Sequence, residues 1–399
     1  MSLSNLWSSI SVTTRHNSDV ERQLEDVGAW LGRSGVQPLA ISLSLGGIYW
    51  GIDPNAEVDL DPMLDLFISF IGCWENVHLE LVGPFRGSIS SIHLLRAPLL
   101  RRFKAVFEYG SGEVLEPLFS MLSASPHLTD FTSCDNCDAA IYISASALPW
   151  SQLTRFETDH YLEVMECFNV LRLCPNLIDC TFQSLAPLEL PSPVPDGLSI
   201  VHRHLRVLTL RVEHDEPDLH EFFDHLTLPA LSAFVIFFTG HDWPQISFKA
   251  FLSRSGCSLK TIKLYTTALS TDELVELLSL LPTLKEFTIR GSEFDPLGDT
   301  LFLRLIYDET AEESCLCPEL EVVTLSGSIA PSNGMLAKML ESRYRSDTSQ
   351  ARITGLQKVT IMLNPRQYEY QQQKKYWKEL ETVRKRGLEV AMVLDRDPT

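Results

Sequence analysis

The sequence predicts an α/β solenoid, in which short strand–helix units stack on one another along the chain. A leucine-based frame recurs at a narrow period, and the spacing of apolar residues changes from two to about 3.6 between successive frames. Proline often stands just before the next frame. A chain of 399 residues is too long for one ordinary hydrophobic core, and it shows no linker that would separate two domains.

The frame reads L-x-x-L-x-L, where other apolar residues can replace leucine. Its first positions are Val36, Trp74, Leu100, Leu128, Leu153, Leu177, Leu205, Leu231, Leu259, Leu284, Leu320 and Leu356. Eight of the eleven spacings lie between 24 and 28 residues, the length of one strand plus one helix in a leucine-rich repeat. We therefore expect a leucine-rich-repeat solenoid of about 12 irregular repeats, a horseshoe with a parallel concave sheet and helices on its convex side.

The residues between the frames predict the helices. Apolar residues at helical spacing occur over Leu162 to Leu173, Thr271 to Leu281 and Gly334 to Tyr344. Proline cannot continue a helix, so it sets where each unit ends. Such prolines are Pro126, Pro175, Pro229, Pro282 and Pro318.

Each end of a solenoid needs a cover for its apolar core. The amphipathic segment Val20 to Leu31 predicts an N-terminal cap helix, and a helix over Gln367 to Arg386 with a strand over Leu388 to Leu394 would close the other end. The expected organisation is a cap region at residues 1–35, repeats at 36–364 and a C-terminal cap at 365–399.

Charge and composition limit the partners. The net charge is −19, which makes duplex nucleic acid and anionic membranes poor partners. Residues 351–399 hold ten basic and six acidic residues and are the only locally basic part. We find neither a signal peptide nor an apolar run long enough to span a bilayer. The nine scattered cysteines favour a reducing compartment, the cytoplasm or the nucleus.

Several short motifs resemble those of the F-box leucine-rich-repeat proteins of mushroom-forming (basidiomycete) fungi. The motifs are LCPNL (Leu173 to Leu177), LCPEL (Leu316 to Leu320), LPWSQLT (Leu148 to Thr154), FLSRSGCSLK (Phe251 to Lys260) and MLESRYR (Met339 to Arg345). The resemblance implies a receptor whose F-box docks on the Skp-type adaptor of a cullin-RING ubiquitin ligase while the repeats present a substrate. Leu6 to Ile10 resembles the stretch that follows an F-box, so the chain is expected to lack that module.

Catalytic and metal motifs are weak. Cys134 and Cys137 form a C-x-x-C, but a structural zinc site normally needs a second pair. The nearest pair, Cys315 and Cys317, lies about seven repeats away. The histidines form no metalloprotease motif, and no nucleophile elbow or phosphate-binding loop occurs. We therefore expect no catalytic residues, no metal site, no cofactor and no enzymatic activity.

The outward positions of the strands predict the binding site. In the extended frame the third, fifth and seventh residues face away from the core, because strand side chains alternate. Arginine and aromatic residues are enriched at protein interfaces. The predicted partner site joins such residues from four neighbouring strands: Arg211, Val235, Phe237, Lys263, Tyr265 and Arg290. The alternative is that Phe237 and Tyr265 pack under loops.

A second set of outward residues, of mixed charge, is the less favoured candidate: Arg102, Lys104, Asp130, Arg155 and Glu157. The leading functional hypothesis is the substrate-recognition part of an F-box-type SCF ubiquitin ligase, which holds a protein substrate on the concave face. Skp-type adaptor and cullin are partners only if an F-box lies upstream. The alternative is a stand-alone interaction or inhibitor protein without a link to the ligase.

Overall fold

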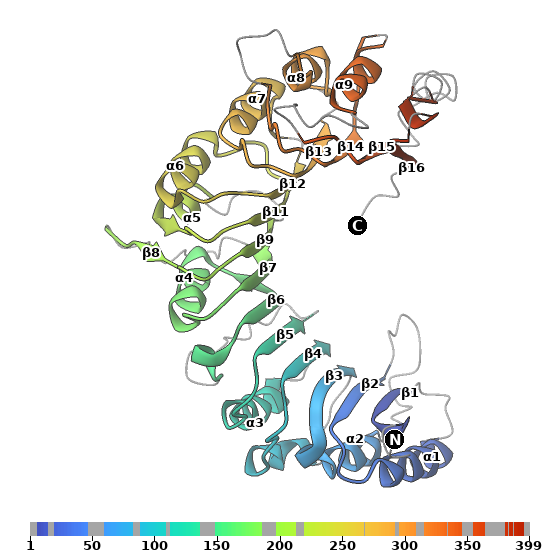
Figure 1. Ribbon diagram of the computed structural model, residues 1–399. Helices are drawn as coiled ribbons and strands as arrows, with labels where there is room; N and C mark the ends of the chain where they lie inside the picture. Colours follow the sequence, from blue (N-terminus) through green and yellow to red (C-terminus); the bar gives the residue numbers. More distant parts are fainter. Residues whose placement is uncertain are drawn as a thin grey trace. The chain divides into compact units, whose positions relative to one another are not determined.

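The computed structural model describes most of the predicted repeat region. The described residues are 6–14, 20–46, 60–82, 88–108, 112–135, 148–185, 197–212, 219–266, 268–291, 295–308, 315–332, 334–344, 354–363, 380–381, 383–385 and 387–394. They form two compact units (Figure 1). The first unit comprises Met1–Leu162 with Glu166–Gln183, and the second comprises Glu163–Met165 with Ser184–Thr399. The boundary falls within the repeats, where the sequence has no linker.

Parallel strands follow one another in chain order in both units. Those of the first are β1 (Ser9–Thr14), β2 (Leu39–Leu45), β3 (Trp74–Val82), β4 (Arg102–Glu108), β5 (Asp130–Asp135), β6 (Arg155–Leu162) and β7 (Asp179–Leu185). Those of the second are β9 (Val207–Val212), β11 (Ala233–Phe238), β12 (Thr261–Thr266), β13 (Glu286–Gly291), β14 (Val322–Gly327), β15 (Lys358–Leu363) and β16 (Glu389–Leu394). The short strands β8 (Ile200–Val201) and β10 (Leu226–Thr227) pair separately.

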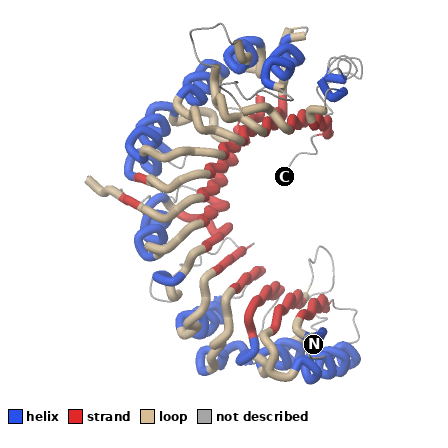
Figure 2. Tube along the Cα trace, in the orientation of Figure 1, coloured by secondary structure: helices blue, strands red, loops and turns tan. Residues whose placement is uncertain are grey.

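Helical segments connect the strands. The α-helices are α1 (Val20–Ser34), α2 (Asp61–Ile68), α3 (Gly112–Ser123), α4 (Val164–Leu173), α5 (Leu219–His225), α6 (Gln245–Ser255), α7 (Thr271–Ser279), α8 (Asp299–Leu305) and α9 (Met335–Arg343). Short 3-10 helices are η2 (Ile71–Cys73), η3 (Ser88–Leu94) and η4 (Trp150–Gln152). Within each unit the helices lie on one side of the strands (Figure 2), and we call the other side the open face. The three helices predicted from apolar spacing are confirmed to within two residues at each end.

The core follows from the alternation along the strands. On β9, β11 and β12 every second residue is buried, as the frame predicts. The strands pair in register, so that Leu208, Phe234 and Ile262 stand side by side, each fully buried. Each strand–helix unit therefore completes its apolar face only by stacking on its neighbours.

The N-terminal cap differs from expectation, and the C-terminal cap is described in part. The cap helix is present as α1, but Ser9–Thr14 forms a strand that pairs with β2, so the sheet begins before the predicted repeat boundary at residue 36. The alternation and β-branched residues of this segment favour a strand. The predicted C-terminal strand is confirmed as β16. Of the helix predicted over Gln367 to Arg386, only residues 380–381 and 383–385 are described, and they are helical.

Candidate binding surfaces

The open face of the second unit brings together the predicted partner-site residues on β9, β11 and β12. Phe237 lies opposite Arg211 on one side and Tyr265 on the other. Val235 lies opposite Lys263 in the neighbouring row. This placement follows from the frame, because equal spacing from each first leucine puts the same positions in register.

Three of these side chains form a continuous stack, which we call the aromatic ladder: Arg211, Phe237 and Tyr265. The Phe237 and Tyr265 rings are stacked at 4.4 Å between centroids and 4° from parallel. The Arg211 guanidinium carbon lies 5.0 Å from the centre of the Phe237 ring, a cation–π contact. All three side chains are half-buried. The rings pack against each other, and part of each side chain stays accessible to a partner.

The other predicted residues of this surface lie beside the ladder. Lys263 pairs with Glu286 on β13 at 2.8 Å, and both side chains are about one third exposed. Arg290 lies on β13 opposite Ser326 of β14. Farther along the same face, Lys358 pairs with Glu389 at 2.6 Å. The patch therefore combines apolar rings with a basic rim, and Glu286 neutralises part of its charge.

Two threonines at outward positions of the frame, one in each unit, have little access to water. Thr132 of the first unit and Thr288 of the second are buried, with 7% and 3% of their surfaces exposed. Each stands in register beside a lysine on the neighbouring strand. A short side chain beside a longer one loses part of its access to water.

The open face of the first unit carries a groove of about 460 Å³ that crosses β1 to β6. All five mixed-charge residues line it: Arg102, Lys104, Asp130, Arg155 and Glu157. The groove is open to solvent along its length. The structure thus joins the less favoured candidate residues into one concave feature.

His78 also lines the groove and was missed by the sequence analysis. It occupies the fifth position of the loose frame that begins at Trp74, so applying the outward rule there would have found it. Its Nε2 atom is buried and has no hydrogen-bond partner among the described residues. Burial, and to a lesser extent the positive charge of Lys104, lower the pKa of His78, and Glu80 opposes them. His78 therefore takes up a proton less readily than an ordinary histidine.

The sequence predicted neither a metal site nor a catalytic residue. Within those ranges, no group of three or more His, Cys, Asp or Glu side chains could hold a metal ion. Burial raises the pKa of both Cys134 and Cys317 to about 12, so neither is a ready thiolate. Cys137 lies outside the described residues.

One serine–histidine pair has the geometry of a nucleophile and its base. Ser133 Oγ lies 2.8 Å from His160 Nε2. However, only 1% of Ser133 and 5% of His160 is exposed. A substrate cannot reach a nucleophile at this depth, so the pair fits a hydrogen bond of the core better than a catalytic centre.

Comparisons with known proteins show little. No family model matches the chain, and no curated protein sequence matches it. Among solved structures, the chain is similar to a crystal structure of a protein from Bacteroides fragilis, with 15% identity and a TM-score of 0.32. The match covers 77% of this chain and 66% of that protein, slightly less than two thirds of its length. Such a weak likeness says nothing about what this chain binds. In the described ranges, no helix is long and apolar enough to cross a bilayer.

Proposed function

We propose that this chain is a protein-binding scaffold of the leucine-rich-repeat type, which captures a partner protein on the open face of its second unit. The aromatic ladder is the observation that carries the proposal. Stacked rings beside Arg211 supply the apolar and guanidinium groups that dominate the energy of protein interfaces. The repeating frame and the regular burial on β9 to β12 support the leucine-rich-repeat horseshoe as its architecture.

In this proposal the chain is a receptor and not an enzyme, and it needs no metal or cofactor. The buried Ser133 and His160 pair and the protonated thiols support that view. We place the protein in the cytoplasm or the nucleus, because all the described cysteines are free thiols, as in a reducing compartment. Its net charge of −19 disfavours nucleic acid and anionic membranes as partners.

The partner would be a substrate of an SCF ubiquitin ligase if an F-box precedes these repeats, as the motif resemblance implies. The alternative is a stand-alone interaction or inhibitor protein. Co-expression with a Skp-type adaptor and a cullin, using the gene product with its upstream coding sequence, separates the two. Co-purification of both proteins supports the ligase receptor, and their stable absence leaves the stand-alone scaffold.

The ladder itself is tested with matched baits. Wild-type protein, a Phe237→Ala/Tyr265→Ala double variant and a Thr324→Ala control would each be cross-linked in a cell extract. The captured proteins that depend on the rings would then be purified and titrated. We expect the double variant to weaken binding at least about tenfold, since removal of an anchor costs about 2 kcal/mol or more. The control should bind as the wild type does.

The proposal fails if every captured protein binds the double variant and the wild type equally well. It fails as well if none of them binds in purified form. Circular dichroism of the variants checks that they keep the fold. A loss of binding can then be attributed to the ladder.

A further inference from the structure

A row of alternating charge runs along the open face of the first unit, and its first three members line the groove. Arg102, Asp130, Arg155 and Asp179 come from the successive strands β4, β5, β6 and β7. Arg102 lies 3.9 Å from Asp130, and Arg155 lies 3.6 Å from Asp179, measured from Nε to a carboxylate oxygen. By formal charge the row is neutral, and Asp179 extends it beyond the candidate set of mixed charge.

The side chains of this row differ in exposure. The side chains of Arg102 and Arg155 are 72% and 51% exposed, whereas those of Asp130 and Asp179 are 24% and 31% exposed. Burial raises the pKa of both aspartates, although nearby arginines act in the opposite direction. The carboxylates are recessed and the guanidinium groups project, so the groove presents positive charge to solvent.

These cations keep their hydrogen-bonding capacity. Both ion-pair distances exceed the 2.7–2.9 Å typical of a charge-assisted hydrogen bond. Within the described residues, neither Arg102 nor Arg155 donates a hydrogen bond. Lys104 is exposed and makes no ion pair in those ranges, and its neighbours in register are His78 and Thr132. Three donor groups without strong partners therefore line one groove.

We propose that the groove of the first unit binds an acidic segment of a partner protein, whose carboxylates are received by Arg102, Lys104 and Arg155. The planar fork of arginine matches a carboxylate in a bidentate geometry. An extended segment fits the dimensions: six strands about 4.8 Å apart span about 24 Å, or about seven extended residues.

A nucleic acid fits the same groove poorly. Asp130 and Glu157 also line it, beside the three cations. A short segment with separated carboxylates can meet the cations and leave gaps at these two acids, whereas a nucleic acid carries a phosphate at every nucleotide. The net charge of −19 repels both ligands, and it repels a nucleic acid more because a nucleic acid carries more charge.

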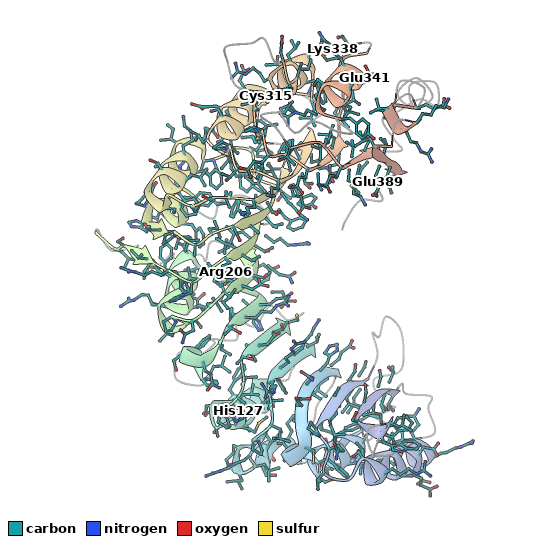
Figure 3. The ribbon with its side chains drawn as sticks, in the orientation of Figure 1. His127, Arg206, Cys315, Lys338, Glu341 and Glu389 are labelled. Carbon is teal, nitrogen blue, oxygen red and sulfur yellow. The ribbon has the colours of Figure 1, made fainter. Side chains whose placement is uncertain are left out.

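The test uses a fluorescent peptide of about eight residues that alternates glutamate and glycine, titrated by anisotropy at low ionic strength. We expect it to bind more tightly than a matched lysine–glycine peptide. Each of Arg102→Gln, Lys104→Gln and Arg155→Gln should weaken binding about three- to tenfold, and the triple variant at least about thirtyfold. The control is Arg206→Gln, an exposed arginine of the second unit (Figure 3), which should change binding less than about twofold.

Three results would overturn the proposal: preference for the lysine peptide, equal loss of binding in Arg206→Gln, or tighter binding of a single-stranded oligonucleotide of equal charge. The variants lie at exposed positions, and circular dichroism verifies their fold. This site does not depend on the aromatic ladder. The Phe237→Ala/Tyr265→Ala variant should bind the acidic peptide unchanged, so a failure here is distinguishable from a failure of the proposed function.

Discussion

The rings of Phe237 and Tyr265 lie face to face on adjacent strands, with their centroids 4.4 Å apart and their planes 4° from parallel. They come from equivalent positions of successive repeats and meet because β11 and β12 pair without a register shift. The same register puts Arg211 against the other side of Phe237. One repeated position thus becomes a continuous surface.

This contact predicts an energetic coupling between the two rings. Replacing Phe237 and Tyr265 by alanine, singly and together, should give non-additive losses in the free energy of unfolding. The coupling should be about 0.5–1.5 kcal/mol, as for other aromatic pairs, measured by urea unfolding of the four proteins. Phe237 and Thr324, which lie on strands that are not neighbours, should be additive within about 0.5 kcal/mol. Additive losses for the ring pair would contradict the stacking.

A buried arginine predicts a large effect on stability. Arg343 of α9 is fully buried, and its guanidinium donates hydrogen bonds to the backbone carbonyls of Leu305, Leu316 and Cys317. Arg343→Met should lower the free energy of unfolding by roughly 3–5 kcal/mol, because it leaves buried carbonyls without donors.

The matched control is Lys338→Met on the same helix, at an exposed position (Figure 3), which should change stability by less than about 0.5 kcal/mol. Thermal and urea unfolding measure both variants. Equal stability of the two would show that Arg343 does not hold these carbonyls.

The start of α7 predicts a smaller and more local effect. Ser270 accepts a hydrogen bond from the backbone N–H of Glu273, and the Glu273 carboxylate accepts one from the backbone N–H of Ser270, which forms a capping box. Ser270→Ala should cost about 1 kcal/mol and Ser270→Asp much less, because aspartate also caps helices. Amide hydrogen exchange in the first turn of α7 should speed up in the alanine variant alone. Equal exchange in both variants would count against the cap.

His78 predicts a dependence of stability on pH. Its pKa is lowered in the folded protein, mainly by burial, from an ordinary value of 6.5. Below that value the unfolded chain takes up a proton that the folded chain resists, so His78 destabilises the fold increasingly as the pH falls. Above it, the residue has no such effect.

The thermal midpoint should therefore fall less between about pH 7 and pH 5 in His78→Asn than in the wild type. The exposed His204 serves as the control, and His204→Asn should retain the wild-type slope. Identical slopes in all three proteins would refute the role of His78.

Two of the motifs that carry the family resemblance acquire a physical role. Arg254 of FLSRSGCSLK and Arg343 of MLESRYR lie in the last turns of α6 and α9. Each donates to backbone carbonyls at the end of the preceding helix, α5 and α8 respectively. In both cases the arginine joins one repeat to the previous one.

The sequence alone determined the strand–helix repeat and the outward positions of the second unit, because both are local periodicities of the chain. It placed Arg211, Phe237 and Tyr265 on one face, and the structure agrees. It overlooked the strand at Ser9–Thr14 and the outward His78, although the same alternation was visible there.

Only the tertiary structure decided which outward side chains touch and which charges reach solvent. In the frame, Arg102 and Asp130 are outward residues of equal and opposite charge. Folding leaves the Arg102 side chain exposed and the Asp130 side chain recessed. Likewise, the sequence gives no sign that Arg343 is fully buried. Exposure depends on neighbours that register brings from other repeats, and a periodicity read along one strand does not contain them.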